Sequence, residues 1–105
     1  MEHTALLYFV GPAGAGKSTL VATLQEWMQH QRYDGVAVNL DPGAETVPYQ
    51  AAIDVREKFT LKEIMNEYSL GPNGAQVVCA DLLAVELDWI RGHIEEINCD
   101  YFLVD

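Results

Sequence analysis

The chain has 105 residues, of which 50% are hydrophobic, and it carries 6 lysines and arginines against 16 aspartates and glutamates. The resulting formal charge of −10 argues against non-specific binding to nucleic acid or to an anionic membrane. This length accommodates one domain at most, and no apolar run is long enough to span a membrane. Cys79 and Cys99 are too few and too far apart for a disulfide framework or a metal knuckle. We expect a cytoplasmic protein.

The first predicted unit is a strand, a glycine-rich turn and a helix. Leu6–Val10 has the unbroken apolar character of a buried parallel strand, and residues 11–19 then read GPAGAGKST. This segment satisfies the pattern G-x-x-x-x-G-K-[ST]. The four fixed positions are Gly11, Gly16, Lys17 and Ser18. Apolar residues at helical spacing predict a helix from Ser18 to about Gln31.

These residue types match the needs of a polyphosphate ligand. Glycines let several backbone N–H groups approach the phosphates closely, and the N-terminus of the following helix adds unpaired N–H groups and partial positive charge. Lys17 would place its charge on the β- and γ-phosphates, and the Ser18 hydroxyl would ligate Mg²⁺. A flexible loop with an incidental lysine is the alternative. The strand before the loop and the helix after it favour the phosphate site.

A second short strand is predicted at Val36–Leu40, and Asp41 follows at its C-terminal tip. Because ligands bind at that edge of open α/β sheets, Asp41 could reach the phosphates or their metal. An ordinary turn aspartate before a proline accounts for this position equally well. Residues 48–56 show no clear period and predict an extended loop. Residues 60–63 match a capping box that opens a short helix ending at Tyr68.

The remaining segments predict a turn, a long helix and a last strand. Residues 70–75 combine Gly-Pro and Asn-Gly, which are strong turn signals. A long helix is then expected from about Gln76 to Asn98, with an apolar seam at heptad-like spacing that packs on the chain's own sheet or against another subunit. The seam consists of Leu83, Leu87, Ile90, Ile94 and Ile97.

The chain closes on the apolar residues Tyr101–Val104, followed by Asp105. This is the Walker B pattern, a buried strand (here 100–105) that delivers a carboxylate toward Mg²⁺ opposite Ser18. The elements predict an α/β fold, namely a three-layer P-loop NTPase with a mainly parallel sheet, truncated after the Walker B strand. About three parallel strands are expected, with one edge and one face poorly covered.

Three features now coincide: the P-loop at 11–19, the run Asn-Leu-Asp-Pro at 39–42 and the tripeptide Gly-Pro-Asn at 71–73. Together they resemble the GPN-loop GTPases, within the dimerising P-loop nucleotidases of the SIMIBI group, and the compact N-terminus favours the archaeal branch. The resemblance implies that residues 1–105 form the N-terminal part of one GTPase domain, with a first switch region at 39–57. The family's base-reading motifs would lie beyond this sequence.

The resemblance also implies a GTP-hydrolysing switch that is active as a homodimer or paralogue heterodimer, with GTP as substrate, GDP as product and Mg²⁺ as cofactor. Catalytic roles are implied for Lys17, Asp41 and Asn73, and Asn73 would reach across the dimer from the GPN loop. The residues implied to cradle the phosphates are Gly14, Ala15, Gly16, Lys17, Ser18 and Thr19. Those implied for the GPN loop are Gly71, Pro72 and Asn73. Those implied to serve the metal are Ser18, Asp105 and Asp41.

Protein clients are implied as partners, with no direct binding to nucleic acid or membrane, and the roles of Glu45, Tyr49 and Arg56 stay open. One alternative function is a P-loop kinase acting on a small molecule or a nucleic-acid end. Such a kinase would need a lid with clustered arginines, and the arginines of this sequence form no cluster. A non-catalytic nucleotide-binding interaction module is the other alternative, and the intact Lys17 and Asp105 argue against it.

Overall fold

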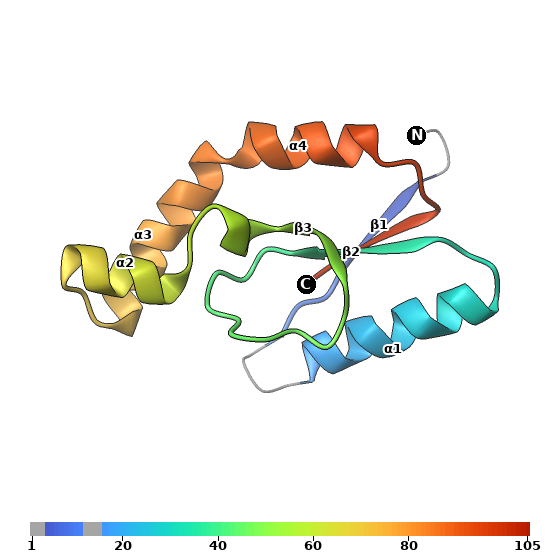
Figure 1. The fold of residues 1–105 in the computed structure, drawn as a ribbon, viewed down its shortest axis with the longest axis horizontal. Coiled ribbons are helices and arrows are strands. Elements are labelled where there is room, and N and C mark those ends of the chain that lie inside the picture. The colour runs from blue at the N-terminus through green and yellow to red at the C-terminus, as the bar shows by residue number, and fades with distance from the viewer. Residues whose placement is uncertain (1–3, 12–15) are drawn as a thin grey trace.

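The structure, a computed structural model, describes residues 4–11 and 16–105 and shows a sheet with helices on both sides (Figure 1). The described strands are β1 (Ala5–Tyr8), β2 (Gly35–Asn39), β3 (Ala51–Asp54) and β4 (Tyr101–Val104). They form one sheet in the order β1-β4-β2-β3, and every neighbouring pair is parallel. The predicted α/β fold with a parallel sheet is confirmed.

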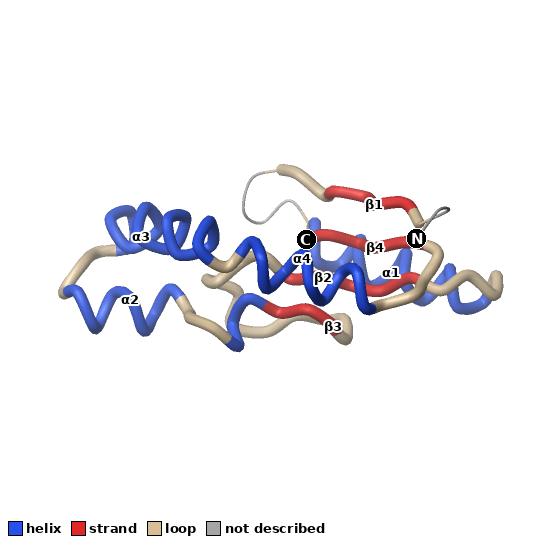
Figure 2. Tube along the Cα trace, turned by 90° about the horizontal axis from the view of Figure 1, so that it is seen from above, coloured by secondary structure: helices blue, strands red, loops and turns tan. Residues whose placement is uncertain are grey.

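The described helices are α1 (Lys17–His30), α2 (Leu61–Tyr68), α3 (Pro72–Val85), α4 (Leu87–Glu96) and the short 3-10 helix η1 (Val55–Glu57). α1 covers one face of the sheet and α4 the other (Figure 1). α2 and α3 pack together beyond the carboxyl ends of the strands (Figure 2). None of these helices, within the described ranges, is long and apolar enough to cross a membrane.

The core forms on both faces of the sheet because side chains alternate along each strand. Leu103 of β4 packs with Val21 of α1, whereas its neighbours Phe102 and Val104 pack on the opposite face with Ile94 of α4. A third cluster joins η1, α2 and α3 around residues such as Val55, Ile64 and Ala75. Helices on both faces of the parallel sheet produce the predicted three layers. The expected incomplete coverage of an edge and a face is found at the edge strand β1, where Leu6 and Tyr8 are exposed.

The extended loop predicted for residues 48–56 is wrong in part, because Ala51–Asp54 forms β3 at the edge of the sheet. The expected three strands are therefore four in the described chain. β3 has only four residues and mixed exposure, and its register with β2 shifts between Ala37 and Val38. So short and irregular an edge strand leaves no period in the sequence, and the pairing with β2 decides its structure.

The start of the predicted long helix is also wrong. α3 begins at Pro72, inside the segment predicted as a turn, and Gly71 is its N-cap with φ −74° and ψ 174°. Proline suits the first helical position, since its fixed φ is already helical and its missing N–H has no intrahelical acceptor there. The turn is therefore shorter than predicted, and the second and third residues of the GPN tripeptide are helical.

The long helix is further interrupted at Glu86, where ψ is 7°, and α3 and α4 run in different directions (Figure 1). The predicted seam is divided as a result. Leu83 packs against the α2–α3 cluster, Ile94 packs on the sheet, and Leu87 at the break is 53% exposed. One of the two predicted uses of the seam was packing on the chain's own core. This holds for the part of the seam on each side of the break, represented by Leu83 and Ile94.

Candidate functional site

The central contact of the site joins the start of α1 to the end of β4. Ser18 lies in the first turn of α1, and its Oγ donates a hydrogen bond to Oδ2 of Asp105 over 2.8 Å. β4 lies between β1 and β2, so Asp105 emerges in the middle of the carboxyl edge of the sheet. The fold thus brings together two residues that the sequence assigned to separate motifs.

Gly16 adopts the left-handed backbone conformation that a glycine-rich phosphate loop needs where it enters its helix. Gly16 has φ 83° and ψ 18°, and α1 begins at Lys17. A Cβ at Gly16 would meet no atom of the described residues within 4 Å, and its positive φ is the reason that glycine suits this position. Lys17 is partly buried and Thr19 is exposed. Gly14 and Ala15, also predicted to cradle the phosphates, lie outside the described residues.

Tyr49 is a member of the site to which the sequence assigned no role. Its hydroxyl donates to the same Asp105 Oδ2 over 2.7 Å, and the residue is 8% exposed within the core cluster of Val21 and Leu103. Burial, and then the hydrogen bond and charge of Asp105, raise the pKa of Tyr49 far above its ordinary value. The hydroxyl therefore keeps its proton. A tyrosine in a loop without periodicity offers no sequence signal of such a long-range contact.

Asp41 follows β2 but turns toward its own loop. Its Oδ1 accepts a hydrogen bond from the Gly43 N–H over 2.9 Å, which is the geometry of an aspartate-initiated turn. Asp41 is exposed, and the described residues contain no group of three or more His, Cys, Asp or Glu positioned to hold a metal ion. The hydrogen bond from Gly43 directly supports the turn role of Asp41, whereas its metal role stays a prediction.

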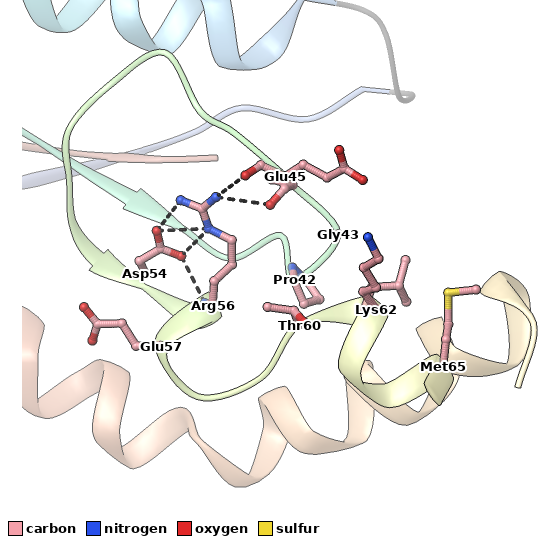
Figure 3. Close-up of a pocket in the computed structure, with 11 residues that line it drawn as sticks. Pro42, Gly43, Glu45, Asp54, Arg56, Glu57, Thr60, Lys62 and Met65 are labelled. Atoms are coloured by element: carbon pink, nitrogen blue, oxygen red, sulfur yellow. Dashed lines mark hydrogen bonds and ion pairs between the residues drawn. The ribbon is translucent and has the colours of Figure 1, made fainter. Parts of the chain in front are cut away.

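Arg56 holds the loop that follows Asp41. Its Nε and Nη2 donate to both carboxylate oxygens of Asp54, with the Nη2–Oδ2 distance at 2.6 Å, and its Nη1 donates to the carbonyl oxygens of Ala44 and Glu45 (Figure 3). The guanidinium of Arg56 holds the pKa of Asp54 below its usual range, against the effect of burial. Arg56, held by Asp54 at the end of β3, thus fastens the loop through its bonds to Ala44 and Glu45.

Asn39 connects the same loop to the sheet. It is fully buried at the end of β2, its Nδ2 donates to Asp54 Oδ1 over 3.1 Å, and its Oδ1 accepts from the Asp41 N–H over 3.0 Å. A buried amide with partners on both its oxygen and its nitrogen is stabilising, whereas an unpaired one would be costly. In the sequence, Asn39 was only part of the 39–42 motif. Its hydrogen bonds to Asp54 and Asp41 show that it bridges the sheet and the loop.

A cavity of about 790 Å³ lies between this loop and α2 (Figure 3). Glu45 and Arg56 line one side of it, and Lys62 and Met65 of α2 line another. Ser18, Tyr49 and Asp105 are not among its lining residues. The cavity is therefore separate from the Ser18–Asp105 contact.

The GPN tripeptide does not join the site within this chain. Gly71 caps α3, Pro72 and Asn73 are its first two residues, and all three are exposed. α2 and α3 lie beyond the carboxyl ends of the strands in both views (Figures 1 and 2). The structure thus brings together Ser18 and Asp105, with Tyr49 added, and leaves the tripeptide elsewhere on the surface.

The donor set fits a magnesium ion. The Ser18 hydroxyl and the Asp105 carboxylate are hard oxygen donors, which Mg²⁺ prefers, and they are already in hydrogen-bond contact. Both residues are partly exposed, so an ion and its waters have access to them. These two residues are the ones that would hold it.

Comparison with known proteins places this geometry in context. Residues 9–105 match the model of a family described as "Conserved hypothetical ATP binding protein". GPN-loop GTPase 2 of Xenopus tropicalis is 42% identical over 96 residues, covering 91% of this chain and 31% of that protein. GPN-loop GTPase 3 of Saccharomyces cerevisiae is 42% identical over 96 residues, covering 91% of this chain and 35% of that protein. The chain spans about a third of the length of these relatives.

A solved structure is similar as well. The crystal structure of a GTPase in its apo form from Pyrococcus abyssi matches with a TM-score of 0.88 and 38% sequence identity. The match covers 100% of this chain and 42% of that chain. This similarity agrees with the P-loop NTPase fold predicted from the sequence.

Proposed function

This chain belongs to the GPN-loop GTPase family, and we propose that the protein containing it is a GTP-binding and GTP-hydrolysing molecular switch. The observation that carries the proposal is the 2.8 Å hydrogen bond between Ser18 Oγ and Asp105 Oδ2. It joins the end of the glycine-rich loop to the Walker B carboxylate, the pair that holds Mg²⁺ in P-loop nucleotidases. The names of the similar proteins support GTP as the nucleotide.

In the proposed reaction, the chain acts mainly by positioning and by charge stabilisation, as is general for phosphoryl transfer. The N–H groups of residues 14–19 and the Lys17 ammonium bind the β- and γ-phosphates. Bound Mg²⁺ would neutralise charge on the phosphate oxygens, and Ser18 and Asp105 would hold it. Asp41, at the end of the strand beside β4, would orient the attacking water.

We propose further that the protein acts as a homodimer or a paralogue pair, with Asn73 supplied in trans. The exposed position of the GPN tripeptide at the start of α3 supports this arrangement, because α2 and α3 lie beyond the sheet of their own chain (Figure 2). An amide is neutral and would orient water or oxygen atoms through hydrogen bonds. Protein clients and a cytoplasmic location belong to the same proposal.

A P-loop enzyme that uses ATP is the second candidate, because the matched family's description names ATP. The deciding experiment compares Mg²⁺-dependent hydrolysis of GTP and ATP by the full-length protein. We expect preferential turnover of GTP. Preferential turnover of ATP would contradict the proposal and favour the kinase or another ATP-dependent activity.

The same assay tests the role in trans. We expect Asn73→Ala to slow hydrolysis while nucleotide affinity stays close to wild type, and Lys17→Ala to abolish turnover. Mixing the two variants should restore part of the activity, because one site of each mixed dimer combines an intact Lys17 with the partner's Asn73. Asn66→Ala, an exposed asparagine on α2, is the matched control. A hydrolysis rate that Asn73→Ala leaves unchanged, or no recovery of activity in the mixture, would contradict the shared site.

A further inference from the structure

We propose that Tyr49 is a positioning residue of the metal site, whose hydroxyl orients the Asp105 carboxylate and links it to the first switch loop. The inference rests on the proposed function, since it requires that Ser18 and Asp105 hold Mg²⁺. Neither the sequence motifs nor the matched family's description assigns Tyr49 a role.

The geometry that carries the inference is the convergence of two hydroxyls on one oxygen. Ser18 Oγ and Tyr49 OH donate to Asp105 Oδ2 over 2.8 and 2.7 Å. Among the described residues, no side-chain hydrogen bond reaches Oδ1 of this carboxylate. A carboxylate has about four lone-pair sites, so pinning Oδ2 fixes its rotation and presents Oδ1 to a metal ion or a metal-bound water. Such hydrogen bonds to ligating groups tune the affinity of a metal site.

The tyrosine ring is itself held by the elements that it connects. Tyr49 is 8% exposed and belongs to one core cluster with Val21 and Leu103. Val21 lies on α1 one turn beyond Ser18, and Leu103 lies on β4 two residues before Asp105. The hydroxyl therefore has a position fixed by packing against both halves of the site, which is what positioning a carboxylate requires.

Tyr49 also belongs to the loop between β2 and β3, residues 40–50, which contains Asp41. Arg56 holds the first part of this loop through the carbonyl oxygens of Ala44 and Glu45, and Tyr49 holds the last part through Asp105. Side-chain hydrogen bonds thus hold both the first and the last part of the loop. Leu40, at the start of the loop, reaches only the backbone oxygen of Asp105. Movement of the second half of the loop would withdraw the Tyr49 hydroxyl from the Asp105 carboxylate, so the loop is coupled to the proposed metal ligand itself through this side-chain contact.

The test is Tyr49→Phe in the full-length protein, which removes the hydroxyl and keeps the ring. The rate at which a fluorescent GDP analogue dissociates is measured across a titration of free Mg²⁺. We expect the Mg²⁺ concentration at the midpoint to rise about ten-fold, the lower end of the range for lost outer-shell contacts. Nucleotide affinity in EDTA should be unchanged. Tyr68→Phe, at an exposed tyrosine of α2, should leave the midpoint at the wild-type value.

The outcomes separate the inference from the proposed function. A wild-type midpoint in Tyr49→Phe overturns the inference, and so does an equal loss of affinity in EDTA, which would indicate packing alone. If the wild-type protein retains the nucleotide equally well with and without Mg²⁺, the proposed function is overturned instead. Hydrogen exchange of the wild-type protein is a second test that needs no variant. Amides of residues 41–50 should gain protection when Mg²⁺ joins bound GDP, and exchange independent of Mg²⁺ would contradict the coupling.

Discussion

The ion pair of Arg56 and Asp54 makes a quantitative prediction about stability. Arg56→Met removes the guanidinium and keeps most of the aliphatic side chain. Three hydrogen bonds to the Asp54 carboxylate are lost, together with two to the carbonyl oxygens of Ala44 and Glu45. Asp54 would then keep only the Asn39 amide and the backbone N–H of residue 56.

The magnitude follows from how much of the pair is buried. The Arg56 and Asp54 side chains are 23% and 15% exposed, so the carboxylate left behind would be largely shielded from water. Breaking a fully buried pair by removing one partner costs about 3–5 kcal/mol. The remaining exposure reduces this cost, and we expect Arg56→Met to lower the free energy of unfolding by about 2–3 kcal/mol.

The same pair predicts a pH dependence with a definite sign. Arg56 lowers the pKa of Asp54 in the folded protein. The stabilisation is therefore fully present above the unfolded-state pKa of about 3.9 and is lost as the pH falls through the lower folded-state value. The difference between wild type and Arg56→Met should hold at neutral pH and shrink below about pH 4.

Urea unfolding of the full-length protein, followed by circular dichroism at neutral and acidic pH, measures both effects. Asp54→Asn and the double variant complete a double-mutant cycle that isolates the energy of the pair. Arg91→Met, at an exposed arginine of α4, is the control and should change stability by no more than about 0.5 kcal/mol. A loss as small as that of the control, or one that persists unchanged in acid, would refute the reasoning.

Two further predictions concern a helix cap and core packing, and both are measured by urea unfolding. Thr60→Ala should cost about 1 kcal/mol, because Thr60 Oγ1 accepts the Glu63 N–H at the start of α2; Thr60→Ser keeps the acceptor and should stay close to wild type. Leu103→Ala should cost about 2–5 kcal/mol in the buried core, whereas Leu87→Ala, at the break between α3 and α4, should cost less than about 1 kcal/mol. Equal losses at the two leucines would contradict the division of the predicted seam.

Local sequence patterns were sufficient for the elements that carry the phosphate-site motifs. β1, α1, β2 and β4 lie within one or two residues of their predicted bounds, and Thr60 caps α2 as predicted. The GKS sequence and the Asp105 that follows four apolar residues also predicted that Ser18 and Asp105 face one another, and the structure shows a direct hydrogen bond between them. These predictions succeed because an apolar run, helical spacing and a glycine-rich turn each act within a few neighbouring residues.

The Gly-Pro signal was present in the sequence but was assigned to the wrong structure. Gly71 and Pro72 do end a turn, yet they also begin α3, because proline is favoured at the first helical position as well as in turns. The break at Glu86 has no glycine or proline beside it to predict it. It separates the part of the helix that packs on α2 from the part that packs on the sheet.

The sequence by itself determined the family, the parallel α/β architecture and the two motifs of the proposed phosphate site, since each motif and each of these strands is encoded by residues adjacent in the chain. Only the tertiary structure decided that residues 51–54 pair with β2, that Arg56 fastens the β2–β3 loop and that Tyr49 reaches Asp105. Tyr49 and Asp105 lie 56 residues apart, and no local pattern encodes their meeting. Their contact arises because the β2–β3 loop and the end of β4 pack against the same face of α1.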